Sequence, residues 1–249
     1  MGKLTGLIQF TGKFDGLSFY EMNGKIVVRK TGGFDGEKIK NSPKFVRVRE
    51  NSSEFAQSAR AGKYFRNSIG LHLKKMRIPY VHNRIVSLFQ EITKLDTISE
   101  RGERSVAIGI RTLEGIRAVQ AFEFDKTVAF SSIFPFECRV DFANEKLRIE
   151  QFTIARIKKP ESASHVRLRF VFVGLDFEQQ DQFILNESAV FSFDLKMVHP
   201  ETLSLDLPCA IPSSSTVFGL LFIEFVQKVN GDDFVLRDCY LKIVDLVEL

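Results

Sequence analysis

The chain has 249 residues, a length that accommodates one large domain or a larger domain with a smaller one attached. With 44% hydrophobic and 27% charged residues, its composition excludes collagen-like, low-complexity and wholly disordered chains. Charge is divided unevenly, because residues 1–80 carry 16 Lys and Arg against 6 Asp and Glu, whereas residues 81–249 carry 19 against 25. A basic first third favours contact with nucleic acid, with an anionic surface or with an acidic face of another copy.

The sequence predicts neither a membrane span nor a classical export signal. Its longest nearly uncharged apolar run, residues 217–225, has about half the length that crosses a bilayer, and no apolar run of signal-peptide length opens the chain. Three widely spaced cysteines, Cys138, Cys209 and Cys239, indicate no disulfide framework. We therefore expect no membrane insertion, and either a cytoplasmic protein or one released as an assembly without a signal peptide.

The N-terminal segment is predicted to form a small β unit. Residues 17–22 and 25–30 flank Asn23-Gly24, a pair that favours the type I′ turn of a β-hairpin. The hairpin stands between two similar segments, residues 11–16 and 31–36, each of which ends in an Asp-Gly pair typical of tight turns. We expect these two turns to cap one small sheet.

Two helices are predicted next. Ser42 and Pro43 are typical of a helix N-cap and first turn. The helix that follows is expected to bury a stripe of residues at helical spacing, widened by Phe45 and Phe65: Val48, Ser52, Phe55, Ala59, Gly62, Arg66 and Ile69. Residues 71–79 are interpreted as a basic connector, and a second helix is predicted from Val81 to Leu95.

From about residue 104 the pattern indicates strands, including alternating segments at 136–142, 147–154, 166–172 and 189–197. A slip in alternation at Glu150-Gln151 indicates a β-bulge, and residues 216–229 and 234–247 form a predicted terminal hairpin. Together with residues 104–126 this gives about eight strands. The predicted fold is α+β and mainly β: a β-hairpin and helical pair (residues 1–100) packed on a C-terminal antiparallel β-sandwich (residues 101–249).

The sequence predicts no catalytic residues, cofactor or metal. Its histidines, His72, His82, His165 and His199, lack metal-ligand spacing, and the phosphate-loop and nucleophile-elbow motifs are absent. We expect His72 and His82 to lie on the basic helical surface. A catalytic triad assembled from distant segments is left open by these patterns.

The basic helical region is the predicted contact surface. Its candidate residues are Arg47, Arg49, Arg60, Lys63, Arg66, Lys74, Lys75 and Arg77. They could follow a phosphate backbone, with Tyr64 and Tyr20 supplying stacking. The alternatives are a solvated helix face, or a face that docks on the acidic region of the same or a neighbouring chain.

The segments Gly16–Arg29 and Ile39–Phe55 combine a glycine-marked hairpin that ends in Arg with a helix that carries Arg and Asn near its start. In this respect residues 4–70 resemble the N-terminal signature of an uncharacterised family of bacterial β-rich proteins. The resemblance implies no activity.

These observations predict a non-enzymatic, self-assembling structural subunit, such as that of a bacterial filament, tube or phage-like particle. Opposite charges on the two parts of the chain suit head-to-tail contacts. The opening segment could add as a strand to a neighbour through Leu4, Leu7, Ile8 and Phe10. Residues 217–225 are apolar on both faces, so the second face needs a cover unless the strand is central. The alternatives are a nucleic-acid-associated binding protein and, more distantly, an enzyme of unrecognised type.

Overall fold

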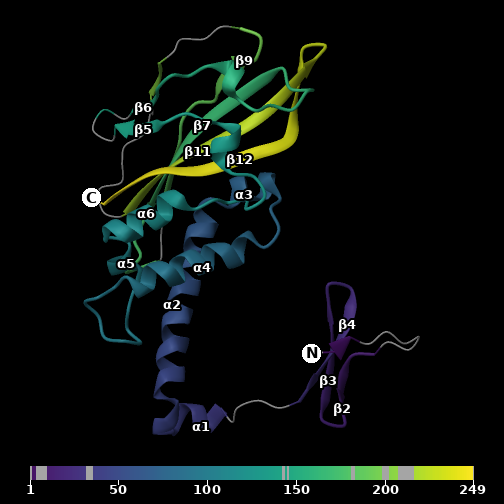
Figure 1. Ribbon diagram of the computed structural model, residues 1–249, viewed down its shortest axis with the longest axis vertical. Helices are drawn as coiled ribbons and strands as arrows, with labels where there is room; N and C mark the ends of the chain where they lie inside the picture. Colours follow the sequence, from purple (N-terminus) through teal and green to yellow (C-terminus); the bar gives the residue numbers. More distant parts are fainter. Residues whose placement is uncertain are drawn as a thin grey trace. The chain divides into compact units, whose positions relative to one another are not determined.

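A computed structural model of the chain describes residues 2–3, 10–31, 36–141, 144, 146–180, 183–197, 202–206 and 216–248 (Figure 1). The chain forms two compact units, Met1–Glu50 and Asn51–Leu249. This division differs from the boundary predicted at residue 100. Its cause is the core of the second unit, where Phe65 and Phe89 of the helical region are buried in one cluster with Phe218 of the C-terminal sheet. Helix α4 and most of α2 therefore belong to the same unit as that sheet.

The first unit contains an antiparallel sheet in the order β1-β4-β3-β2. Its strands are β1 (Gly2–Lys3), β2 (Gly12–Phe14), β3 (Leu17–Met22) and β4 (Lys25–Lys30). Asn23 and Gly24 have φ values of 53° and 72°, which confirms the predicted hairpin turn. Asp15 and Gly16 also have positive φ and join β2 to β3. The second predicted turn lies partly outside the described residues, and its Gly36 begins helix α1 (Gly36–Asn41).

The predicted strand-adding residues lie at the start of this unit. Leu4, Leu7 and Ile8 are outside the described residues. Phe10 is 44% exposed, and its ring centroid lies 4.4 Å from that of Phe19 on β3. Strand β1 pairs with β4 of its own sheet.

The first predicted helix is present as a 3-10 turn (η1, Pro43–Phe45) followed by α2 (Val46–Ser68). The predicted buried face is wrong in its first half, since Val48 and Phe55 are 45% and 53% exposed. The buried residues of α2 are Glu54, Ser58, Ala61, Gly62, Tyr64, Phe65 and Ser68. Polar partners explain the shift, because the Glu54 carboxylate accepts hydrogen bonds from the Gly102 amide and the Arg104 guanidinium, each at 2.8 Å.

The remaining helices differ in part from the prediction. Helix α4 (Val81–Lys94) confirms the second predicted helix, but most of the expected connector is helix α3 (Gly70–Met76). Residues 104–126, predicted as strands, contain α5 (Val106–Gly109) and α6 (Leu113–Ala121), and α7 (Phe130–Ile133) follows. Ser105 and Thr112 cap α5 and α6 by accepting backbone N–H bonds. No helix in the described parts of the chain combines the length and apolarity needed to cross a membrane.

The second unit contains two antiparallel sheets. The five-stranded sheet has the order β12-β11-β7-β8, with β9 also paired to β7, and comprises β7 (His165–Leu175), β8 (Phe183–Glu187), β9 (Phe191–Asp194), β11 (Thr216–Val229) and β12 (Asp232–Glu248). The three-stranded sheet has the order β10-β6-β5, and comprises β5 (Cys138–Asp141), β6 (Lys146–Ile149) and β10 (Leu203–Asp206).

Strand β6 ends where the bulge was predicted, and Gln151 with φ 52° leads toward a 3-10 turn (η2, Ile154–Arg156). The α+β class is confirmed, although helix (34%) and strand (36%) are nearly equal rather than mainly β.

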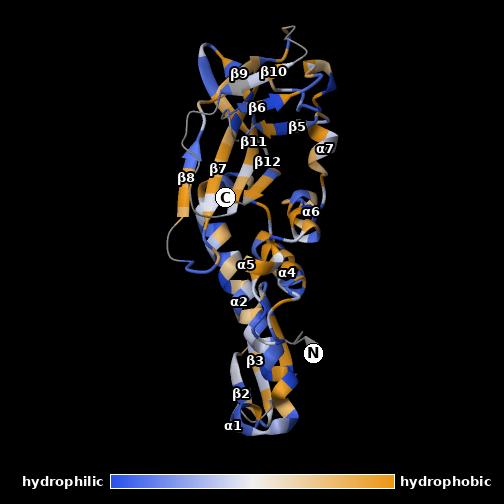
Figure 2. Cartoon of the chain, turned by 90° about the vertical axis from the view of Figure 1, so that its left-hand side faces the viewer, coloured by the Kyte–Doolittle hydropathy of each residue, from blue (hydrophilic) through white to orange (hydrophobic). Residues whose placement is uncertain are grey.

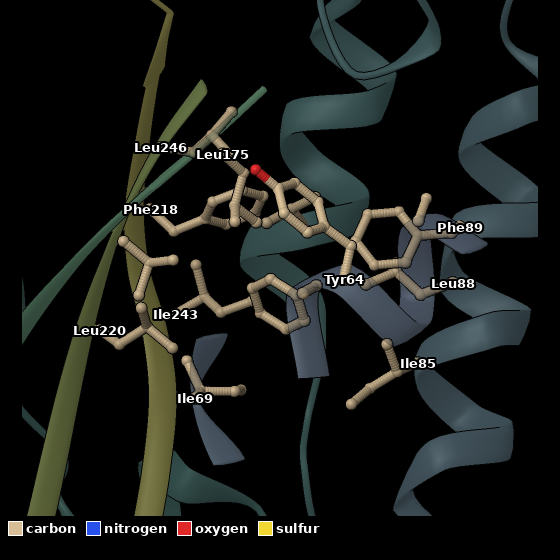
Figure 3. Close-up of a cluster of buried hydrophobic side chains, with 14 of the residues drawn as sticks. Tyr64, Ile69, Ile85, Leu88, Phe89, Leu175, Phe218, Leu220, Ile243 and Leu246 are labelled. Carbon is tan, nitrogen blue, oxygen red and sulfur yellow. The ribbon is translucent and has the colours of Figure 1, made fainter. Parts of the chain in front are cut away.

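Strand β11 is buried on both faces within the chain. Phe218, Leu220 and Phe222 face the helices, and Figure 3 shows Phe218 and Leu220 on the strand side of the cluster, with Tyr64 and Phe89 on the helix side. The alternate residues Val217, Leu221, Ile223 and Phe225 join a second cluster with β6, β7 and α7. Figure 2 shows β7 and β11 as hydrophobic along most of their length. The strand is central, so its apolar second face requires no partner molecule.

Candidate polyanion interface

Helices α2 and α3 carry basic side chains at the protein surface. The second half of α2 is anchored by Ala61, Tyr64 and Phe65, which are buried against α4 and the five-stranded sheet. Helical periodicity then places Arg60 and Lys63 at the surface, where both are exposed. Arg66 is half-buried, and Lys74 and Arg77 are exposed at the end of α3. The core therefore fixes which basic residues reach solvent.

Three of the eight predicted contact residues are engaged within the chain. Arg47 forms an ion pair with Glu50 at 3.0 Å, and Arg49 donates to the carbonyl oxygens of Ile39 and Ser42 at 2.7 and 3.0 Å. Lys75 Nζ lies 2.7 Å from Glu224 Oε1. Arg47 and Arg49 thus contact residues near them in the sequence, whereas Lys75 contacts the distant strand β11.

The other five, Arg60, Lys63, Arg66, Lys74 and Arg77, form what we call the basic strip. Within the described part of the chain, none of them has an ion pair. Some other cations of the same unit are paired, such as Arg104 with Glu54 and Lys242 with Glu123, each at 2.8 Å. The basic strip is thus a group of cations that have no acidic partner among the described residues.

Two depressions lie along the basic strip. The first has a volume of about 830 Å³ and is lined by Arg60 and Lys63 together with side chains from the turn after β7 and the start of β8. The second, of about 640 Å³, is lined by Arg66, Lys74 and the exposed His82. Asn67 lines both, so the two depressions are adjacent. One carboxylate, Glu178, lines the first, and it pairs with Arg111 at 3.6 Å.

The far wall of the first depression was not predicted. It is built by Ser105, Ala107 and Ile108 and by Phe177, Gln179 and Phe183. Tyr64 joins the two walls, because its hydroxyl accepts a hydrogen bond from the Asp176 amide at 3.4 Å and its ring meets those of Phe177 and Phe183. An amide-rich turn between two strands, residues 176–183, was the only sequence signal for this wall.

A buried group of charges lies beneath α3. His72, expected on the surface, is 3% exposed, and its Nε2 lies 3.4 Å from Glu187 Oε1. Glu187 also binds Arg169 at 2.5 Å. Burial is the main reason why the pKa of His72 lies below its usual value; Glu187 and Glu224 oppose this effect, while Arg169 and Lys75 reinforce it. The neutral ring packs edge-on against Phe222, with centroids 4.9 Å apart.

Among the described residues, no arrangement of side chains at the basic strip resembles a catalytic centre. No group of three or more His, Cys, Asp or Glu side chains among them is arranged to hold a metal ion. Burial raises the pKa of the Cys138 thiol to about 12 and that of Cys239 to about 11, so both stay protonated near neutral pH. Ser164 Oγ lies 2.9 Å from His165 Nδ1, but this hydroxyl also binds the backbone of Val226 and Lys228 and joins two strands.

Comparison of the chain with protein-family models, curated proteins and solved structures returns no match. The N-terminal resemblance to bacterial β-rich proteins stays a prediction. Function is therefore inferred from the chemistry of the basic strip and its depressions.

Proposed function

We propose that this chain is a non-enzymatic binding protein for nucleic acid, and that the basic strip is its phosphate-binding surface. The observation that carries the proposal is that five cations of α2 and the α3 region lack acidic partners within the described chain, four of them lining two adjacent depressions, whereas Arg47, Arg49 and Lys75 are engaged. A row of unpaired cations suits a polymer with regularly spaced negative charges. Amide and aromatic side chains between the cations supply groups that bases also contact.

The scaffold that we infer for this surface is a β-sandwich with helices on its outer face. Leu147 and Ile149 of the three-stranded sheet share one buried cluster with Val166 and Leu168 of the five-stranded sheet, which supports two packed layers. The helices cover the opposite face of the five-stranded sheet, and α2 and α3 carry the basic strip. Such a scaffold holds the five cations on rigid elements.

The test is oligonucleotide binding followed by fluorescence anisotropy over a range of salt concentrations. Five phosphate contacts predict that log K falls with log salt with a slope of about −3 to −4 for a single strand. In the variant Arg60→Glu, Lys63→Glu, Lys74→Glu we expect the slope to become shallower by about 2–3 and the affinity to fall at least tenfold.

A matched control makes the same change in charge elsewhere in the unit. Arg117, Lys126 and Lys158 are exposed, and none lines either depression. The variant Arg117→Glu, Lys126→Glu, Lys158→Glu is expected to retain the slope of the unmodified protein. Equal losses in the two variants, or the absence of binding at low salt, would contradict the proposal.

Self-assembly is a second candidate, and one observation favours it. Phe14 and Leu17 are register partners on one face of the first unit's sheet, and they are 70% and 37% exposed. Exposed apolar side chains that lie together are typical of protein contact sites. The supporting argument from residues 217–225 no longer applies, since both faces of β11 are covered within the chain.

A further inference from the structure

We infer that the first depression accepts an unpaired base, so that the nucleic acid bound by this protein is single-stranded. The inference rests on the proposed function and specifies its ligand. It starts from three rings that line the depression. Tyr64 and Phe177 are 7% and 6% exposed and form its buried part, with centroids 6.2 Å apart. Phe183, at the start of β8, is 40% exposed, and its centroid lies 6.4 Å from that of Tyr64.

The exposed ring of Phe183 is the group available for stacking. Single-strand-binding sites combine such rings with a basic groove, because every base has a π-face while the backbone supplies charge. Here Arg60 and Lys63 line the same depression as Phe183. A volume of about 830 Å³ is within the range of small-ligand sites, about 300–1,000 Å³, and is ample for one base.

The polar side chains of the depression distinguish a base from a simple anion. Gln57, Asn67 and Gln179 line it, and within the described chain none of their side-chain amides has a hydrogen bond. An amide both donates and accepts, as the edge of a base does, whereas a phosphate needs donors alone. Gln180 is excluded from this set, because its amide donates to the Phe177 carbonyl at 2.9 Å.

A base can reach this depression only when it is unpaired. Inside a duplex both faces of each base are stacked and its pairing edge is occupied, so a concave aromatic site cannot receive it. Cations on α2 and α3 alone would bind a duplex and a single strand alike. The depression therefore predicts preference for single strands, and DNA and RNA strands are the two sources of the same chemistry.

The test uses single-stranded DNA, single-stranded RNA and duplex DNA of equal length, measured by anisotropy with the full chain. Phe183→Ala is expected to weaken single-strand binding by about 5- to 100-fold, the range for loss of one base–aromatic stack, and to leave the salt slope unchanged. Ile184→Ala is the matched control, since Ile184 is 48% exposed on the same strand and does not line the depression. It is expected to bind as the unmodified protein does.

A second measurement reports on stacking directly. The chain has no Trp, so Phe183→Trp and Ile184→Trp each introduce a single indole fluorophore. Single strands are expected to quench the indole fluorescence of the Phe183→Trp variant, while a strand of abasic residues does not and Ile184→Trp stays unchanged. Equal affinity for duplex and single strand, or equal effects at positions 183 and 184, would overturn this inference and leave the basic strip's function intact. Absence of binding to all three oligonucleotides would overturn both.

Discussion

Gly109 lies where α5 meets α4, and its lack of a side chain permits their contact. A Cβ at this position would lie 2.0 Å from the carbonyl oxygen of Ile92 and 2.8 Å from its carbonyl carbon. These are backbone atoms inside a helix, so they cannot move aside as a flexible side chain would. We expect Gly109→Ala to lower the free energy of unfolding by about 1–3 kcal/mol or more, measured by urea denaturation.

Gly70, at the start of α3, provides the control for this substitution. A Cβ there would meet no atom within 4 Å, and its φ is not positive. Gly70→Ala is expected to stabilise the protein by about 0.4–1 kcal/mol, because it reduces the freedom of the unfolded chain. Similar losses of stability at both positions would show that the α4–α5 contact is not the cause.

At the scale of elements, α3 is joined to the sheet by buried charges and one histidine. Groups that face His72 come from α3 (Lys75), β7 (Arg169), β8 (Glu187) and β11 (Glu224). Protonating His72 would add a buried positive charge beside two existing cations. The neutral form of His72 is therefore favoured in this contact between α3 and the sheet.

This arrangement predicts how stability changes with pH. The pKa of His72 is lower in the folded than in the unfolded chain, so the unfolded state binds more protons as pH falls below about 6.5. We expect the free energy of unfolding to decrease from pH 7 toward pH 5 and the decrease to be smaller in His72→Leu, measured by urea denaturation at each pH. The pKa values of Glu54 and Asp96 are lowered, so their contributions are lost only at more acidic pH.

The control is His82→Leu, since His82 is an exposed residue on α4. Its variant is expected to keep the pH dependence of the unmodified protein. A profile for His72→Leu that is indistinguishable from that of the unmodified protein would mean that His72 does not govern this pH range.

At the scale of the whole molecule, the uneven charge and the apolar face of the first unit bear on assembly. Residues 1–80 carry 16 basic and 6 acidic residues, and Phe14 and Leu17 lie exposed on one sheet face. If this face joins copies, the mass in solution will exceed 28.4 kDa at micromolar concentration, and Phe14→Asp will return it to that of a monomer. Light scattering after size-exclusion chromatography measures both.

Phe234→Asp is the matched control, because Phe234 is 54% exposed near the tip of the β11–β12 hairpin in the second unit. It is expected to leave the mass of the assembly unchanged. A monomer at every concentration tested would exclude assembly through the Phe14 face, and nucleic-acid binding by the basic strip would be unaffected.

The sequence by itself determined the features that depend on neighbouring residues. The Asn23-Gly24 turn, helix α4, the terminal hairpin and the two-sided burial of β11 all follow from short patterns of turn residues and hydrophobic periodicity. These patterns are local, so they act the same way whatever surrounds them. The eight candidate cations were likewise visible as a basic segment.

Only the tertiary structure decided which of those cations form ion pairs within the chain and which side chains line the depressions beside the others. Lys75 and Lys74 are neighbours in sequence, yet Lys75 meets Glu224, 149 residues away, while Lys74 stays exposed. Burial of Glu54 depends on Arg104, and the first depression depends on Phe183 folding back beside Tyr64. Such pairings join segments that are far apart in the chain, so a local sequence pattern does not indicate the partner. The energy of a buried charge or ring depends on the groups that surround it in the folded protein.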